Sequence, residues 1–188
     1  MGKTIAMINQ KGGVGKSLIA DELLFEFERL NIDYNFYDLD GQSGLIHEPV
    51  KNEKAKYTVV DTPGQLTEDI KTVIMESDVI IVPTRASIKE MEPLERTLQL
   101  IKASKKKNAA VIMVLNGWTR YTVYTQFEEW LRKSYPEFEK IVTLPQSEPL
   151  AQAGANGESV ITYKPRCIAS DQLKKLWAIV EYELGMKI

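Results

Sequence analysis

The fold is decided by the segment Asn9-Gln10-Lys11-Gly12-Gly13-Val14-Gly15-Lys16-Ser17. It follows a short apolar run and precedes a pattern of apolar residues at helical spacing. A strand, a glycine-rich loop and a helix in this order form a phosphate cradle. Glycines let successive backbone N–H groups converge on phosphate oxygens, and the helix N-terminus adds a favourable dipole. In such a cradle, Lys16 is placed to reach the β- and γ-phosphates of a nucleotide, and the Ser17 hydroxyl to bind Mg²⁺.

The rest of the chain alternates short apolar runs with longer periodic segments, which is typical of an α/β fold with a mainly parallel sheet and helices on both faces. At 188 residues and 44% apolar composition, we expect one domain over residues 1–188. The predicted strands are Thr4–Ile8, Tyr34–Asp38, Tyr57–Asp61, Asp78–Val82, Ala109–Leu115 and Lys140–Leu144. The predicted helices are Lys16–Leu30, Leu66–Glu76, Pro93–Ser104, Tyr121–Ser134 and Ser170–Leu184.

Composition excludes several classes of protein. No apolar run is long enough to cross a bilayer and the chain starts without a secretory signal pattern, so we expect a cytoplasmic protein without a membrane partner. The apolar stripe of the last predicted helix could lie on a membrane, but Glu181 and Glu183 oppose anionic lipid and favour core packing. A lone cysteine, Cys167, supports neither a disulfide scaffold nor a zinc cluster. The net charge of −2 means that any DNA binding must come from a local patch.

The phosphate loop departs from the general pattern in an informative way. Glycine is usual where this chain has Gln10, and a second lysine, Lys11, precedes Gly12. The run Lys-Gly-Gly-Val-Gly-Lys-Ser resembles the deviant Walker A motif of the ParA/MinD family of P-loop ATPases. The resemblance implies ATP and Mg²⁺ as cofactors and a homodimer that forms on ATP binding. It also implies a catalytic role for Lys11, which would reach the phosphates bound by the other subunit, although Lys11 could instead be a solvated loop lysine. The nucleotide-binding residues of this loop would be Gly12, Gly13, Val14, Gly15, Lys16 and Ser17, with Lys16 also catalytic.

Acidic residues follow the second and third predicted strands. Asp38 and Asp40 alternate, so both carboxylates point the same way at the carboxyl end of a strand. By resemblance to the family's first switch, Asp40 would position the attacking water and the magnesium shell, while Asp38 would support the loop. A capped turn is the alternative for either alone. Asp61 ends a buried strand as a Walker B carboxylate does, which gives Ser17, Asp40 and Asp61 as the predicted metal site. The next residues, Thr62-Pro63-Gly64, are the candidate second switch.

Recognition of the base is predicted in the second half of the chain. Asn116 follows the fifth predicted strand, and its amide offers a donor and an acceptor that suit adenine. A strand-terminating turn at Asn116-Gly117 is the alternative. The segment Leu144–Leu150, with Pro145, and the following Ala153–Val160 resemble the loop that closes over the base in the family. Gln146 stands where many relatives have arginine. The connection Ser43–Lys56 is shorter than the family's, and its histidine, His47, has no predicted role.

Function follows from the resemblance. We expect a slow, partner-stimulated ATP hydrolase of plasmid or chromosome partitioning, similar to the short plasmid-partition members, which binds DNA non-specifically in its ATP state and works with a ParB-like or other DNA-binding adaptor. It would then be nucleoid-associated. Two basic clusters could touch DNA phosphates, although each could equally be a solvated face. They comprise Lys164, Arg166, Lys174 and Lys175 in one, and Lys102 with Lys105 to Lys107 in the other. The alternative is a conjugation-associated or positioning ATPase that recruits a protein cargo. A small-molecule kinase or ligase is disfavoured, because no substrate cluster is visible beyond the nucleotide residues.

Overall fold

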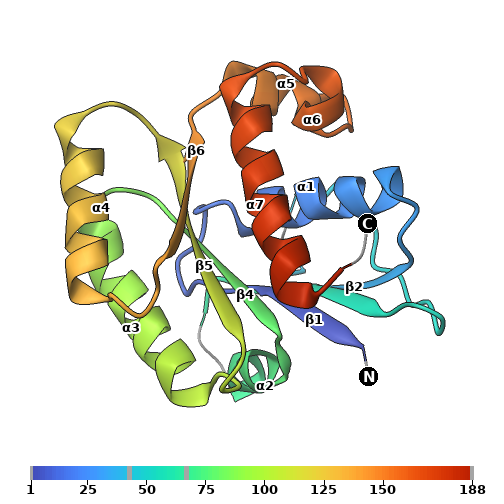
Figure 1. The fold of residues 1–188 in the computed structure, drawn as a ribbon, viewed down its shortest axis with the longest axis horizontal. Coiled ribbons are helices and arrows are strands. Elements are labelled where there is room, and N and C mark those ends of the chain that lie inside the picture. The colour runs from blue at the N-terminus through green and yellow to red at the C-terminus, as the bar shows by residue number, and fades with distance from the viewer. Residues whose placement is uncertain (1, 42–43, 66–67, 187–188) are drawn as a thin grey trace.

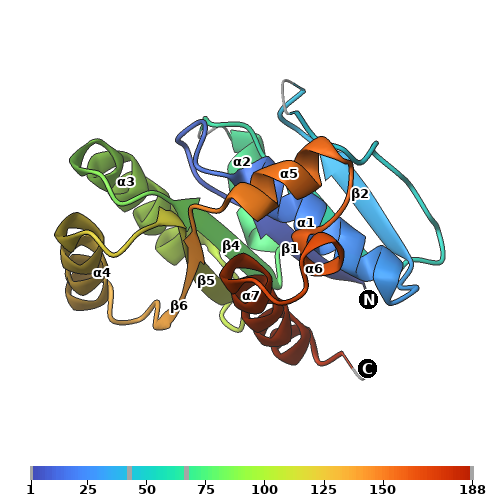
Figure 2. The same cartoon turned by 90° about the horizontal axis from the view of Figure 1, so that it is seen from above.

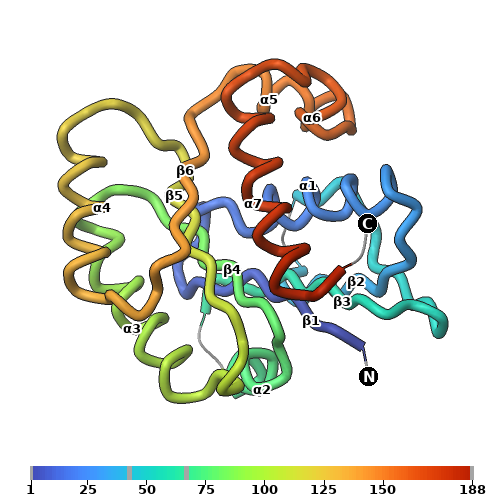
Figure 3. Tube along the Cα trace, in the orientation of Figure 1, coloured from blue at the N-terminus to red at the C-terminus, as the bar shows by residue number. Residues whose placement is uncertain are grey.

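The structure, a computed structural model, describes residues 2–41, 44–65 and 68–186. Within these residues six parallel strands form one sheet in the order β2-β3-β1-β4-β5-β6, with β1 inside the sheet and β2 and β6 at its edges (Figure 3). The strands are β1 (Lys3–Met7), β2 (Tyr34–Asp38), β3 (Tyr57–Asp61), β4 (Val79–Thr84), β5 (Ala110–Trp118) and β6 (Lys140–Pro145). Parallel pairing brings the carboxyl ends of all strands to one edge of the sheet, where the glycine-rich loop follows β1.

Helices cover both faces of the sheet (Figures 1 and 2). On one face α1 and α7 pack over the sheet, with α5 and α6 beside them, and on the other lie α2, α3 and α4. The helices are α1 (Lys16–Arg29), α2 (Glu68–Glu76), α3 (Ile88–Ser104), α4 (Thr122–Ser134), α5 (Glu148–Ala155), α6 (Val160–Tyr163) and α7 (Ile168–Leu184). Each face has its own buried apolar cluster, as expected for parallel strands that are shielded on both sides. The predicted α/β class with a parallel sheet is therefore confirmed.

The apolar stripe of α7 is buried in the core. Leu173, Leu176, Trp177 and Val180 belong to the cluster shared with α1 and the sheet. The core reading of this helix is therefore correct. No helix in the described ranges is both long and apolar enough to span a bilayer.

Helix α3 begins five residues before the predicted start at Pro93. Ser87 caps the helix by accepting a hydrogen bond from Lys89 N, and Glu90 stands three residues after Ser87, as in a capping box. The predicted start puts Pro93 in the first turn, where the missing N–H of a proline costs nothing. In the structure Pro93 lies inside the helix, and its carbonyl accepts a hydrogen bond from Thr97 Oγ1 at 2.9 Å.

The second half of the chain also differs from the sequence prediction. The segment after β6, expected as a loop, forms the short helices α5 and α6, capped by the hydroxyls of Ser147 and Ser159. Helix α7 starts at Ile168, two residues before the predicted Ser170. The predicted start of α2 at Leu66, and Gln42 of the first switch, lie outside the described residues.

The connection between β2 and β3 contains no helix in its described part. It returns along the sheet edge instead, where Val50 and Phe36 exchange two backbone hydrogen bonds of 2.8 and 3.1 Å in an antiparallel bridge. Because no helix lies under this end of the sheet, Tyr37 and Leu39 on β2 and just after it stay 42% and 45% exposed.

Candidate functional site

The glycine-rich loop is held in shape by its first residue. Asn9 is buried, its Nδ2 donates to Pro83 O at 2.7 Å, and its Oδ1 accepts from Lys11 N at 3.0 Å. Gly13 and Gly15 have φ of 75° and 103°, a conformation that side-chain-bearing residues rarely adopt. The loop therefore bends back over the carboxyl edge of the sheet.

Asn116 packs against this loop. It lies inside β5, which runs on to Trp118 through an irregularity in its pairing with β6, and not after the strand end as predicted. Its Nδ2 donates to Val14 O at 2.8 Å across 102 residues of sequence. A Cβ at Gly15 would stand only 2.2 Å from this nitrogen, so glycine is required there for space as well as for φ. Val14 O engages one of the two Nδ2 hydrogens, so Oδ1 and the second N–H of this amide are left for other partners.

The two lysines of the loop have different environments. Lys16 is 4% exposed, and its Nζ donates to Lys11 O at 3.3 Å across the loop. Burial lowers the pKa of Lys16 from its ordinary 10.5, while the negative charges of Asp61 and Asp40 oppose this shift. Lys11 is exposed, and among the described residues its ammonium group makes no hydrogen bond or ion pair.

Ser17 and Asp61 meet at the base of the loop. Ser17 Oγ donates to Asp61 Oδ2 at 2.6 Å, and Asp61 is fully buried. Burial raises the pKa of Asp61 from 3.8 to about 6, although the Ser17 hydrogen bond and the Lys16 charge act against the rise. Its other oxygen, Oδ1, is buried without a hydrogen-bond partner. A buried carboxylate with an unused oxygen next to a hydroxyl is a donor set that fits Mg²⁺ and its water shell, so Ser17 and Asp61 would hold the ion.

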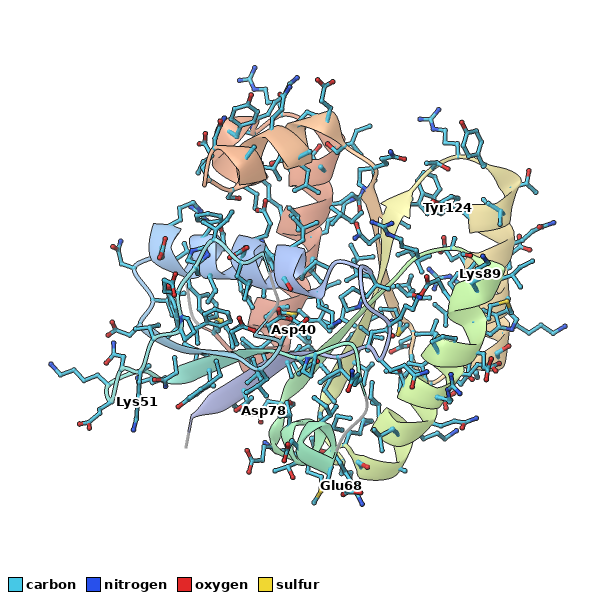
Figure 4. All side chains as sticks on the ribbon, turned by 180° about the vertical axis from the view of Figure 1, so that it is seen from behind. Asp40, Lys51, Glu68, Asp78, Lys89 and Tyr124 are labelled. Atoms are coloured by element: carbon cyan, nitrogen blue, oxygen red, sulfur yellow. The ribbon has the colours of Figure 1, made fainter. Side chains whose placement is uncertain are left out.

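Asp38 and Asp40 shape the turn after β2. Asp38 Oδ1 accepts from Asp40 N at 2.9 Å and from Gly41 N at 3.4 Å, which is the hydrogen bonding of a capped turn. Leu39 N donates to Asp61 O at 2.9 Å, so the turn starts beside the buried carboxylate. Asp40 is half-buried and close enough for its charge to act on Lys16. Figure 4 shows Asp40 between the sheet and α1.

The candidate second switch lies against the loop. Thr62 is buried and donates to Met7 O at 2.6 Å. Gly64 approaches Gly12 so closely that an added Cβ would lie 2.9 Å from Gly12 N. A side chain at position 64 would therefore push this segment away from the phosphate loop.

The structure thus brings together most of the predicted site residues: the loop residues 12–17, Asp61, Asp40 and Asn116. Pro145 ends β6 at the same edge of the sheet. It pairs with Trp118 of β5, the strand that also carries Asn116. The predicted base-closing segment after it is helical, as α5 and α6. The roles of these residues remain proposals.

Several residues of this edge were missed. Arg85 and Arg120 are exposed directly after β4 and near the end of β5, and a list of charged residues after predicted strands would have found them. Asp21 and His47 form a buried pair beside the first switch, which the sequence could not show because 26 residues separate them.

The two basic clusters lie in different surroundings. In the first, Lys164 and Arg166 are exposed at the turn between α6 and α7. In the second, Lys106 pairs at 3.4 Å with Asp78, which directly precedes β4, and Lys102 pairs with Glu137 at 2.6 Å. Lys105 Nζ donates to the carbonyls of Lys106, Lys107 and Ala109, which lie in the turn after α3 and not in the helix itself.

Three comparisons place this geometry among known proteins. The model of the CobQ/CobB/MinD/ParA nucleotide-binding domain family matches residues 5–160. Curated proteins gave no match. Among solved structures, a variant of McdA from Cyanothece in complex with ATP has a TM-score of 0.76 at 17% identity, over 100% of this chain and 98% of that one. MinD from Pyrococcus horikoshii with Mg-ADP has a TM-score of 0.73 at 15% identity, over 100% and 99%.

A putative plasmid partition protein from Borrelia burgdorferi bound to AMPPNP is also similar, with a TM-score of 0.67 at 16% identity over 100% of both chains. At these identities the structures show a shared fold, which agrees with the resemblance in the phosphate loop. The family model extends from β1 through the loop to the start of α6 and so covers both halves of the site. On this match the chain belongs to the CobQ/CobB/MinD/ParA family of nucleotide-binding domains.

Proposed function

We propose that the protein is a Mg-ATP-dependent ATPase that dimerises on ATP and acts in DNA partitioning. The observation that carries the proposal is the buried pair of Ser17 and Asp61, with its unused carboxylate oxygen, directly below a loop that aims Lys16 inward. The similar solved structures are complexes with ATP, AMPPNP and Mg-ADP.

The reaction is hydrolysis of ATP to ADP and phosphate, and the residues act by position and charge. The amides of loop residues 12–17 bind the phosphates, and Lys16 exchanges its contact with Lys11 O for phosphate oxygens. Ser17 and Asp61 would hold Mg²⁺, which would supply charge neutralisation on the phosphates. Asp40 would orient the attacking water and contribute to the magnesium shell. Asn116 and Pro145 lie on the base side, where Asn116 Oδ1 accepts from the adenine amine.

Dimerisation is supported by what the carboxyl edge leaves uncovered. Lys11 is exposed, and Ile88 and Tyr121, at the starts of α3 and α4, are 84% and 72% exposed. Figure 4 shows these first turns, marked by Lys89 and Tyr124, on the same side of the molecule. Large apolar side chains exposed beside a charged site are typical of a surface that a partner covers. A second copy would bury them and bring its Lys11 to this subunit's phosphates.

Three alanine variants test the site. Lys16→Ala should abolish ATP binding, because a buried cation is lost from the phosphate site. Lys11→Ala should spare binding but remove ATP-dependent dimerisation or hydrolysis, and Asp40→Ala should trap the ATP dimer. Equilibrium nucleotide binding, light scattering and phosphate release measure these outcomes, with Lys51→Ala, an exposed lysine on the β2–β3 connection, as the matched control. A Lys11→Ala protein that dimerises and hydrolyses like the control would refute the dimer assignment.

Binding of DNA in the ATP state is proposed through Lys164 and Arg166, because their side chains are exposed, whereas Lys102 and Lys106 are held in ion pairs. The test is a gel shift on non-specific duplex DNA with and without ATP, repeated over a salt titration. Phosphate contacts predict ATP-dependent binding that weakens as salt rises and that Lys164→Ala with Arg166→Ala reduces, but Lys102→Ala does not.

A ParB-like adaptor that speeds hydrolysis belongs to the same proposal. If DNA binding were absent in all nucleotide states, the recruitment of a protein cargo in conjugation or positioning would replace it. Neither outcome tests the ATPase proposal itself, which is tested by the alanine variants of the phosphate loop.

A further inference from the structure

Ile46 and His47, six and seven residues after Asp40, are fastened to α1 by a buried polar contact. Asp21, on α1, accepts hydrogen bonds from the backbone N–H groups of Ile46 and His47 at 3.0 to 3.1 Å. The His47 ring adds a third contact, with Nδ1 2.7 Å from Asp21 Oδ1. Since an ionised carboxylate only accepts hydrogen bonds, Nδ1 carries the hydrogen and donates it. We call this contact the Asp21–His47 clamp.

The clamp is buried and sterically fixed. The side chains of His47 and Asp21 are 8% and 7% exposed. The edge of the His47 ring meets Phe25, with 4.3 Å between ring centroids and an interplanar angle of 66°. Glu28 Oε1 lies 3.6 Å from Nε2 on the outer side. A buried carboxylate that loses such partners incurs a large desolvation penalty, so the clamp has one favoured arrangement.

Its position connects it to the nucleotide site. Asp21 lies one helical turn after Ser17, on the same face of α1, and Ser17 is bonded to Asp61. The turn that starts at Asp38 is tied to Asp61 through Leu39 N. The described residues on either side of Asp40 are therefore anchored to the elements that bear the predicted metal ligands: Leu39 to β3, and Ile46 and His47 to α1 through the clamp.

We propose that Asp21 and His47 are positioning residues that fix the place of Asp40 for ATP hydrolysis. They touch neither the phosphates nor the water, and they act by limiting where the first switch can move relative to Ser17. The inference rests on the proposed ATPase function. Releasing the clamp should slow the chemical step and leave the binding of ATP, which depends on loop residues 12–17, nearly unchanged.

The kinetic test compares three variants of the full-length protein. His47→Ala removes the donor, and His47→Asn keeps an N–H close to the position of Nδ1. Glu28→Gln alters the outer contact of the clamp and the hydrogen bond from the Tyr34 hydroxyl but leaves the Asp21–His47 contacts in place, so it is the matched control. Because displacement of a catalytic group by about 1 Å can cost up to ~100-fold in rate, we expect His47→Ala to lower kcat by roughly tenfold or more, with KM for ATP within about twofold. His47→Asn should recover most of the loss, and Glu28→Gln should behave as the unmodified protein.

A spectroscopic measurement separates release of the clamp from unfolding. His47 is the sole histidine of the sequence, so its ring gives one Hε1 proton resonance. In the native protein this resonance should differ from its position in urea. In Asp21→Ala it should move toward the position in urea, while equilibrium ATP binding shows that the fold persists.

The outcomes are distinguishable. If the unmodified protein neither binds nor hydrolyses ATP, the proposed function fails. If it hydrolyses ATP, the clamp inference is overturned by three results: unchanged kcat in His47→Ala, an equal loss in His47→Asn, or a rise in KM in place of a fall in kcat. An unmoved His47 resonance in Asp21→Ala would also overturn it.

Discussion

Asp61 shows how the needs of folding and of ligand binding conflict at one side chain. It is fully buried, one of its oxygens has no hydrogen-bond partner, and its pKa is raised to about 6. In the unfolded chain the same group titrates near 3.8. Between these values the folded protein binds more protons than the unfolded chain, so the free energy of unfolding falls as pH rises through this window.

We predict that Asp61→Asn stabilises the nucleotide-free protein at pH 7, because the amide carries no charge to desolvate and its oxygen can still accept from Ser17. The shift of the Asp61 pKa from 3.8 to about 6 corresponds to a gain of at most roughly 3 kcal/mol in the free energy of unfolding. Urea unfolding at pH 4 and pH 7 measures it, and the gain should be confined to pH 7. The variant should also lose Mg²⁺-dependent ATP affinity in calorimetry. Equal gains at both pH values would contradict the assignment to ionisation.

Gly15 offers a second prediction for a single residue. Gly15→Ala should lower the free energy of unfolding by about 2 kcal/mol or more, since the left-handed conformation alone costs an alanine about 1–2 kcal/mol and the new Cβ would meet Asn116. In an Asn116→Ala background, the loss of stability caused by Gly15→Ala should be smaller only by the part due to the clash with Asn116. Gly154→Ala is the control, because that glycine has ordinary φ and open space around it, and it should change stability by less than about 1 kcal/mol. A double-mutant cycle by urea unfolding gives the coupling.

The linear sequence indicates the candidate functional residues of this site more readily than the residues that hold them in place. Lys16, Ser17 and Asp61 were predicted because residue type and place after a strand are visible in the sequence. Asn9 had no predicted role, since its partner Pro83 lies 74 residues away. The Asp21–His47 pair was missed for the same reason, because such contacts exist only once the chain has folded.

Helices α3, α5 and α6 show where the prediction of elements depends on single signals. Pro93 displaced the predicted start of α3, although Ser87 and Glu90 formed the stronger start signal. Helices α5 and α6 were assigned to a loop by resemblance, while Ser147 with Pro149 and Ser159 mark helix starts in the sequence. Strands β2 and β3 were predicted with their observed bounds, because short β-branched and aromatic runs between polar segments have few other solutions.

The caps of these helices predict an order of stabilities. Ser87→Ala should cost about 1 kcal/mol, the usual loss of an N-cap. Ser159→Ala should cost more, roughly 2–3 kcal/mol, because the Ser159 hydroxyl also donates to Glu22 at 2.5 Å, and its loss leaves a buried carboxylate with one partner fewer. Thermal unfolding measured for both variants tests the order. Equal losses would mean that Glu22 finds another donor.

For the whole molecule, the class of fold was predictable because short apolar strands alternate with longer helical segments along the chain. A mainly parallel sheet follows from this alternation. The strand order was not predicted. It places β1 between β3 and β4, so Ile5 pairs with both Val59 and Val79. The exposure of Tyr37 and Leu39, where no helix covers the sheet, was not predicted either. It depends on which face of the sheet the β2–β3 connection crosses.

The central place of β1 has a consequence for synthesis of the protein. During synthesis β1 gains its two neighbours, β3 and β4, only after β4, which ends at Thr84, has also emerged from the ribosome. Until then backbone N–H and C=O groups of β1 lack strand partners, and parallel pairing across such separations is intrinsically slow. Nascent chains stalled before β4 emerges should therefore be digested by protease, and chaperones should protect the emerging chain during this interval. Chains stalled after β5 should begin to resist cleavage.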